Sequence, residues 1–112
     1  MATPAAQNLT IVRGDTETLV ITVTSDGTTP INIAGRSYRA QIRREKDAGT
    51  IAASFTCTVT NAAGGQVTCV LSAVDSAGLT AGTNYWDFEE NNSGIVTTIV
   101  AGAVTVLADV TR

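Results

Sequence analysis

Alternation of apolar and polar residues runs through most of this chain and constrains its fold more than any other feature. The clearest case is "ETLVITVTS", in which Leu19, Ile21 and Val23 share one face of an extended chain and threonines dominate the other. A period of two predicts β-strands that are covered on one side by a core. Further runs that predict short strands are "NLTIVR", "SYRAQIR", "IAASFTCTVT", "QVTCVLS", "TNYWDFEE", "GIVTTIVA" and "AVTVLADV".

Turn signals between these runs organise the strands. "NAAGG" and "NNSG" predict two hairpins, and the first would set Cys57 directly opposite Cys69. "SAVDSAGL" breaks the alternation, and Ser72 with Asp75 three residues later predicts one short helical crossover near residues 72–79. Seven or eight short antiparallel strands around such a crossover predict an all-β sandwich or barrel. We expect residues 1–7 to form a flexible N-terminal arm and residues 8–112 a single β-sandwich domain.

Composition and charge exclude several classes of function. The chain has 112 residues, 44% hydrophobic and only 15% charged, with a net charge of -3. This balance predicts no nucleic-acid partner. The sequence holds no apolar run of about 18 residues and no secretory signal, so we expect no membrane partner and folding in a cytoplasm.

The residue types needed for catalysis are scarce. Without histidine the chain lacks the commonest general base and metal ligand, and we expect no enzymatic activity, no cofactor and no metal. Asp87, Glu89 and Glu90 form the only carboxylate cluster. A catalytic pair or a calcium site is conceivable there, but a solvated or partner-facing strand explains it better. Cys57 and Cys69 are either bridged or two packed thiols, and a reducing cytoplasm favours the thiols.

Five of the seven basic residues fall between Arg36 and Lys46, a segment here called the basic stripe. On "SYRAQIR" the alternation puts Arg39 and Arg43 on the wet face. The stripe can dock an acidic partner surface, including the acidic strand of a neighbouring copy, or it can be a solvated face with weak ion pairs. The candidate partner-binding residues are Arg36, Arg39, Arg43, Arg44, Lys46, Asp87, Glu89 and Glu90.

Two further features allow a recognition role beside a structural one. Arg13-Gly14-Asp15 could attach to a cell-surface receptor, but a corner between strands explains all three residues, with Asp15 bonding the amide of Glu17. Trp86 could stack on a sugar ring, although a core tryptophan suits such an alternating strand better.

The order of several motifs resembles a known family. "NLTIVRGDTETLVITVTSDG", "LSAVDSAGL" before the aromatic strand and the closing "VTVLADVTR" are similar to the small Ig-like β-sandwich virion proteins of tailed bacteriophages. The likeness is to the N-terminal domain of their baseplate upper proteins. The resemblance implies an Ig-like sandwich without catalytic residues, whose partners are other virion proteins.

We therefore expect a non-enzymatic structural protein of a phage virion that docks as a homo-oligomer, in particular a trimer. The resemblance favours the tail or baseplate. Since the sequence stops after "DVTR", a capsid decoration or cement role stays open. The alternative is a carbohydrate-binding module that contacts host surface glycans.

Overall fold

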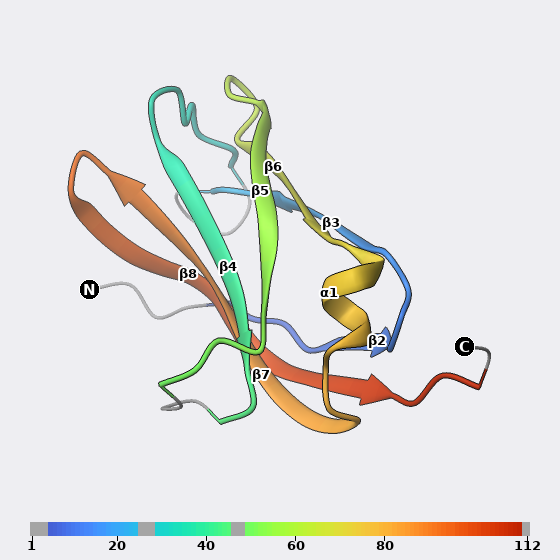
Figure 1. Ribbon diagram of the computed structural model, residues 1–112. Coiled ribbons are helices and arrows are strands. Elements are labelled where there is room, and N and C mark those ends of the chain that lie inside the picture. Colours follow the sequence, from blue (N-terminus) through green and yellow to red (C-terminus); the bar gives the residue numbers. More distant parts are fainter. Residues whose placement is uncertain (1–4, 25–28, 46–48, 111–112) are drawn as a thin grey trace.

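Two curved layers of strands and one short helix make up the protein (Figure 1). The computed structural model describes residues 5–24, 29–45 and 49–110. The all-β prediction with a short helical crossover is confirmed. The elements are β1 (Ala5–Ala6), β2 (Leu9–Val12), β3 (Glu17–Thr22), β4 (Ser37–Arg43), β5 (Ala53–Asn61), β6 (Gln66–Leu71), α1 (Ala73–Ala77), β7 (Gly82–Asn92) and β8 (Ile95–Leu107).

One hydrogen-bonded path links the strands in the order β1-β8-β7-β4-β5-β6-β3, and β2 also pairs with β8. β5 belongs to both layers, because residues 53–55 pair with β4 while residues 56–61 pair with β6. The two layers therefore share a strand instead of being separate sheets. The path ends in β3 on one side and in β1 on the other, where β2 also pairs with β8.

The N-terminal segment differs from the expectation in two ways. β1 and β2 run parallel to β8, whereas the predicted strands were antiparallel throughout. Residues 5–7, which the sequence assigned to a flexible arm, lie against β8, and the Gln7 amide donates to the Ala101 carbonyl at 3.0 Å. Parallel neighbouring strands need a long crossover connection, and here most of the chain separates β2 from β8. No turn motif in the sequence could therefore predict this pairing.

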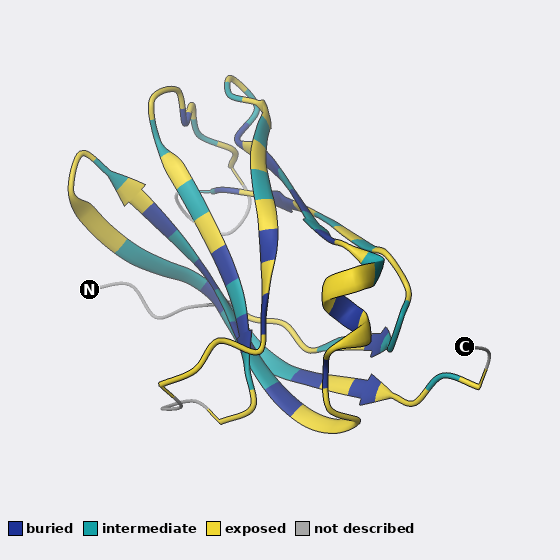
Figure 2. Ribbon diagram, viewed as in Figure 1, coloured by how far each residue is buried: buried dark blue, intermediate teal, exposed yellow. Residues whose placement is uncertain are grey.

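The core lies between the layers and is built mainly from aliphatic side chains. Dark-blue positions alternate along the strands in Figure 2, as the period of two predicts. The β5–β6 hairpin has the predicted register, with Cys57 opposite Cys69 and Val59 opposite Val67. Among the described residues, the largest fully buried aromatic and aliphatic side chains are Phe88, Ile11, Ile33, Ile42, Leu71, Leu79, Val67 and Val104.

The helical crossover forms as its sequence predicts. Ser72 accepts a hydrogen bond from the Asp75 amide at 3.1 Å, and Gly78 ends the helix. The side chain is an N-cap that satisfies one of the free amides of the first turn. Within the described residues, no helix has the length and apolar character needed to cross a membrane.

Candidate docking groove on the outer face of the sheet

Pairing of β4 with β7 brings basic and acidic candidates together within one chain. Arg39 lies opposite Glu89, and Gln41 lies opposite Asp87. Residues directly opposite each other in a sheet share a face, here the outer face of the β8-β7-β4 layer. An Arg39 Nη2 donates to a Glu89 oxygen at 2.9 Å. The basic stripe thus meets the acidic residues Asp87 and Glu89 of its own chain.

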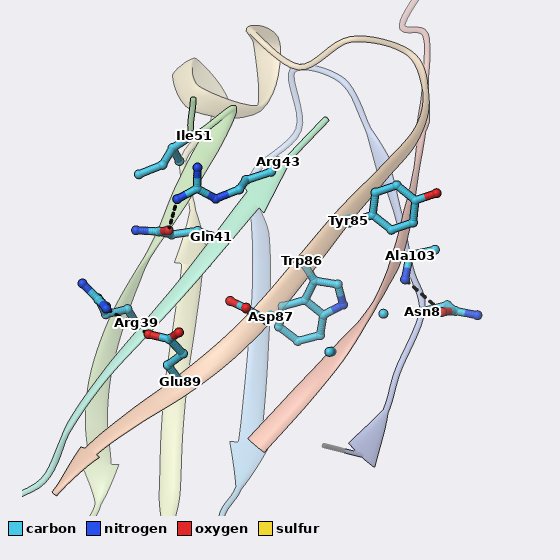
Figure 3. A pocket seen from close by; sticks show the side chains of 12 residues that line it. Asn8, Arg39, Gln41, Arg43, Ile51, Tyr85, Trp86, Asp87, Glu89 and Ala103 are labelled. Carbon is cyan, nitrogen blue, oxygen red and sulfur yellow. Dashed lines mark hydrogen bonds and ion pairs between the residues drawn. The ribbon is translucent and has the colours of Figure 1, made fainter. Parts of the chain in front are cut away.

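The outer face is hollowed into a groove of about 870 Å³, called the outer groove below (Figure 3). Ala101 and Ala103 of β8 lie opposite Asp87 and Tyr85 of β7. The small alanine side chains leave the groove open. Asn8 closes one border, where its Oδ1 accepts from the Ala103 amide at 3.1 Å. The remaining lining residues are Arg39, Gln41, Arg43, Ile51, Trp86, Glu89 and Gly102.

Asp87, the central carboxylate of the groove, has a pKa that its surroundings shift. Partial burial raises the pKa of Asp87, and the neighbouring Glu89 carboxylate raises it further, while Arg43 and Arg39 oppose the shift. Desolvation disfavours the charged form of a carboxyl group. The groove therefore holds a partly dehydrated acid between two arginines, a mixed-charge surface suited to a polar partner.

Two other candidates, Arg36 and Glu90, form a separate cluster with Tyr38 on the inner face. Glu90 is only 8% exposed. Its two carboxylate oxygens each lie 3.3 Å from Nη1 of Arg36, and one accepts from the Tyr38 hydroxyl at 2.7 Å. Burial and this hydrogen bond to Glu90 raise the pKa of Tyr38, whose ring stacks on Phe88 at 5.2 Å. Arg36 and Glu90 therefore stabilise the end of the core and do not contribute to the outer groove.

The last two basic candidates fall elsewhere. Arg44 is exposed, and its Nη1 donates to the Thr83 carbonyl at 3.2 Å, outside the lining of the groove. Lys46 lies outside the described residues. Of the eight residues predicted to bind a partner, the structure gathers Arg39, Arg43, Asp87 and Glu89 in one site.

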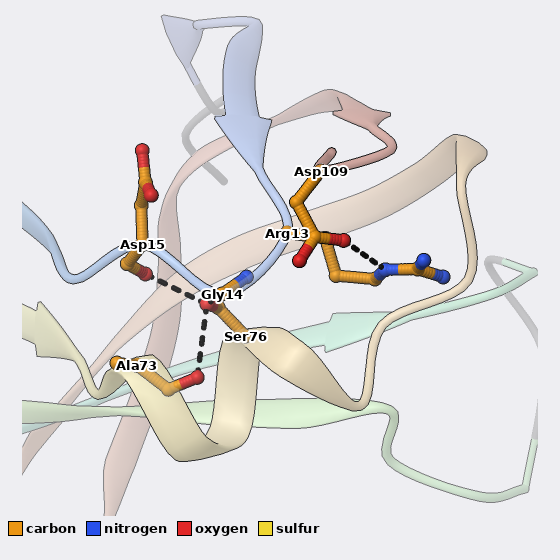
Figure 4. A network of polar contacts seen from close by, with 6 residues as sticks. All are labelled: Arg13, Gly14, Asp15, Ala73, Ser76 and Asp109. Atoms are coloured by element: carbon orange, nitrogen blue, oxygen red, sulfur yellow. Dashed lines mark hydrogen bonds and ion pairs between the residues drawn. The ribbon is translucent and has the colours of Figure 1, made fainter. Parts of the chain in front are cut away.

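The Arg13-Gly14-Asp15 triplet forms a corner between β2 and β3 (Figure 4). Gly14 has a φ of 92°, a conformation that favours glycine. The buried Ser76 hydroxyl of α1 donates to the Asp15 carbonyl at 2.7 Å and accepts from the Gly14 amide at 3.0 Å. Arg13 pairs with Asp109 at 3.1 Å. The strand-corner interpretation is confirmed, but the bonds found at this corner use the Asp15 backbone and not its carboxylate.

Comparison with known proteins gives a similarity to solved structures. No protein-family model matches the chain, and no curated protein matches it. Among solved structures, the chain is similar to the N-terminal domain of phage TP901-1 ORF48, with a TM-score of 0.62 and 17% sequence identity. The similarity covers 93% of this chain and 89% of that one. A shared fold follows. At this identity the likeness concerns the fold alone.

Trp86 is a core residue, as the alternation of its strand predicted, and not an exposed platform for a sugar ring. It is 4% exposed, and its Nε1 donates to the Gln7 carbonyl at 2.8 Å. The carbohydrate reading thus loses the aromatic side chain on which it depended. In the part of the chain that is described, no group of three or more acidic or cysteine residues could hold a metal ion.

Sequence reasoning missed Asn8, Tyr85 and the two alanines of the outer groove. Alternation does place Tyr85 on the face of Asp87, so this signal was present. The position of Asn8 depends on the parallel pairing of β2 with β8, for which the sequence carries no local signal.

Proposed function

We propose that this chain is a non-enzymatic structural protein of a tailed-phage virion, assembled in the host cytoplasm, that binds other virion proteins as a baseplate adaptor of the tail. The observation that carries the proposal is the similarity to the N-terminal domain of phage TP901-1 ORF48 over nearly the whole length of both chains. The motif order that resembles baseplate upper proteins supports the same role. Because a fold can host many functions, the surface has to supply the rest of the argument.

The first supporting feature is the edge strand β3. Among the described strands it pairs with β6 only, so its other side presents backbone donors and acceptors. Val20 on this strand is 61% exposed. An open strand edge with an apolar side chain can accept a strand from another protein, which satisfies the backbone groups and covers the side chain.

The tip of the β7–β8 hairpin is the second feature. β4 pairs with β7 as far as Asn91, and the hairpin continues beyond it through a turn at Ser93 and Gly94, both with positive φ. Ile95 and Val96 are exposed directly after the turn. Adjacent exposed aliphatic side chains on a projecting hairpin suit burial in a protein interface.

The outer groove is the third feature, and it is the one that mutations can test most directly. Its arginines and carboxylates face outward side by side, and such mixed charge sets orientation and specificity at an interface more than affinity. Arg43 lines the groove while the adjacent Arg44 does not. This pair provides a matched comparison, since the same charge reversal at neighbouring positions should affect docking differently.

The experiment uses particles produced from the genome that carries this gene. We expect mass spectrometry of purified virions to detect the chain, and separated tails to contain it. With Arg43→Glu incorporation should fall at least several-fold, whereas Arg44→Glu should leave it near the native level. Absence of the chain from purified virions would contradict a virion role. Equal incorporation of both variants would contradict docking through the outer groove.

Two alternatives have separate tests, one on the separated heads and tails and one on the isolated chain. Recovery of the chain with heads instead of tails would replace the adaptor role by capsid decoration or cement. Binding of host polysaccharide by the isolated chain, lost in Tyr85→Ala, would favour a glycan-binding module that uses the groove. Light scattering of the purified chain tests the homo-oligomer, for which we propose a trimer, one of the closed cyclic symmetries that homo-oligomers adopt.

A further inference from the structure

We propose that Cys57 and Cys69 form a reversible dithiol–disulfide pair, which low-molecular-weight disulfides such as oxidised glutathione convert into a covalent link between β5 and β6. This inference is independent of the proposed virion role. It stands on the geometry of the β5–β6 hairpin and on the different exposure of the two sulfurs.

The two cysteines are already positioned for a bond. They lie directly opposite each other in register, and both thiols are free, with Sγ atoms 3.2 Å apart. Opposed residues of antiparallel strands have Cα atoms about 4.5–5.5 Å apart, within the range of about 4.4–6.8 Å that disulfides span. The sulfurs need to approach by only about 1 Å to reach bonding distance. No strand has to move to another register.

The pair is asymmetric, which assigns a role to each thiol. Cys69 is completely buried, whereas Cys57 is only partly buried. A hydrogen bond with the Cys69 thiol lowers the pKa of Cys57, and the backbone of Ala40 adds to this effect against the opposing effect of burial. The same contact, together with burial, raises the pKa of Cys69. Cys57 is thus both the more accessible sulfur and the better thiolate.

The reaction proceeds in two exchanges. The Cys57 thiolate attacks one sulfur of oxidised glutathione, whose S–S bond breaks to release one glutathione thiolate. Cys69 transfers its proton to that departing thiolate and attacks Sγ of Cys57, which expels the second glutathione. Two protein thiols are oxidised to one disulfide, and one glutathione disulfide is reduced to two thiols. Because the Cys69 sulfur is adjacent, the mixed disulfide on Cys57 is short-lived.

The test treats the folded chain with oxidised glutathione, quenches with acid and measures the intact mass and the linked peptides. The native chain should lose about two mass units, corresponding to two hydrogen atoms, and retain no glutathione. Cys69→Ser should accumulate one glutathione on Cys57, because no second thiol displaces it. Cys57→Ser should stay unmodified over the same time, since Cys69 is buried.

The melting temperature of the native chain gives a second, independent measurement. Closing the loop between the two cysteines should raise the melting temperature of the oxidised native chain by at least a few degrees, and dithiothreitol should reverse the rise. The double variant Cys57→Ser/Cys69→Ser is the control and should not respond. The proposal fails if the native chain keeps a stable glutathione adduct, if it forms only intermolecular dimers, or if Cys57→Ser reacts as fast as Cys69→Ser.

Discussion

Adjacent glutamates of β7 occupy very different environments although they follow each other in the chain. Glu90 is buried beneath Arg36 and Tyr38, while Glu89 pairs with Arg39, whose side chain is 69% exposed. Removing one partner of a buried charged cluster leaves the others unsatisfied, whereas an exposed ion pair contributes little. At the scale of single residues, burial and not formal charge therefore decides which carboxylate stabilises the fold.

We expect Glu90→Ala to lower the free energy of unfolding by about 1–3 kcal/mol, because it leaves Arg36 and the Tyr38 hydroxyl without their acceptor. Glu89→Ala is the matched control on the opposite face and should cost about 0–1 kcal/mol. Urea denaturation at neutral pH measures both. Equal losses for the two variants would mean that the inner cluster is no more stabilising than the surface pair.

Asp87 gives a prediction about pH. Its pKa is raised in the folded chain by burial and by Glu89, so folding favours the protonated form. The ionised form therefore destabilises the fold above the folded-state pKa, and the penalty disappears below the unfolded-state pKa. We expect Asp87→Asn to raise the melting temperature at pH 7 and to have no such effect in strong acid. A melting temperature that falls at pH 7 would contradict this assignment.

At the scale of elements, the corner between β2 and β3 is fixed by α1. The Ser76 hydroxyl bridges the Gly14 amide and the Asp15 carbonyl and is completely buried. We expect Ser76→Ala to lower the free energy of unfolding by about 1–3 kcal/mol, since it leaves two backbone groups unpaired in the interior. Asp15→Ala is the control and should change the thermal melting curve little, because the exposed carboxylate is not the group that Ser76 binds. A larger loss of stability in Asp15→Ala than in Ser76→Ala would mean that the Asp15 side chain, and not Ser76, stabilises the corner.

A glycine decides whether the N-terminal segment can dock on β8. A Cβ at Gly102 would collide with the Gln7 carbonyl, the group that accepts from Trp86 Nε1. We expect Gly102→Ala to displace residues 5–7 and to lower the free energy of unfolding by about 1–3 kcal/mol. Trp86 is the only tryptophan, so its emission should shift to longer wavelength as the indole meets water. Gly49→Ala, where a Cβ meets nothing within 4 Å, is the control.

The elements that sequence predicted well are those fixed by neighbouring residues. The Cys57–Cys69 register follows from a turn of a few residues, and α1 follows from the capping of Ser72. The outer groove was only half predictable. Alternation put Arg39 and Asp87 on outward faces, but their approach depends on the pairing of β4 with β7, which are distant in sequence. Nothing local specified the parallel β1 and β2 strands, which is why the predicted arm extended too far.

At the scale of the whole molecule, the same layer of strands builds both the core and the candidate docking site. The layer formed by β8, β7 and β4 carries the core on its inner face and the outer groove on its other face. The exposed edge of β3 and the hairpin tip lie on different elements, so several faces are available for contacts at once. This distribution suits a protein that joins neighbours in an assembly.

The membership of β5 in both layers determines how the protein carries mechanical load. A pull applied at β8 reaches β3 through β7, β4, β5 and β6, a route of backbone hydrogen bonds and covalent chain. In a sandwich of two separate sheets the same tension would cross side-chain contacts, which slide more easily. The shared strand thus gives the two layers a continuous backbone connection that does not depend on side-chain contacts across the core.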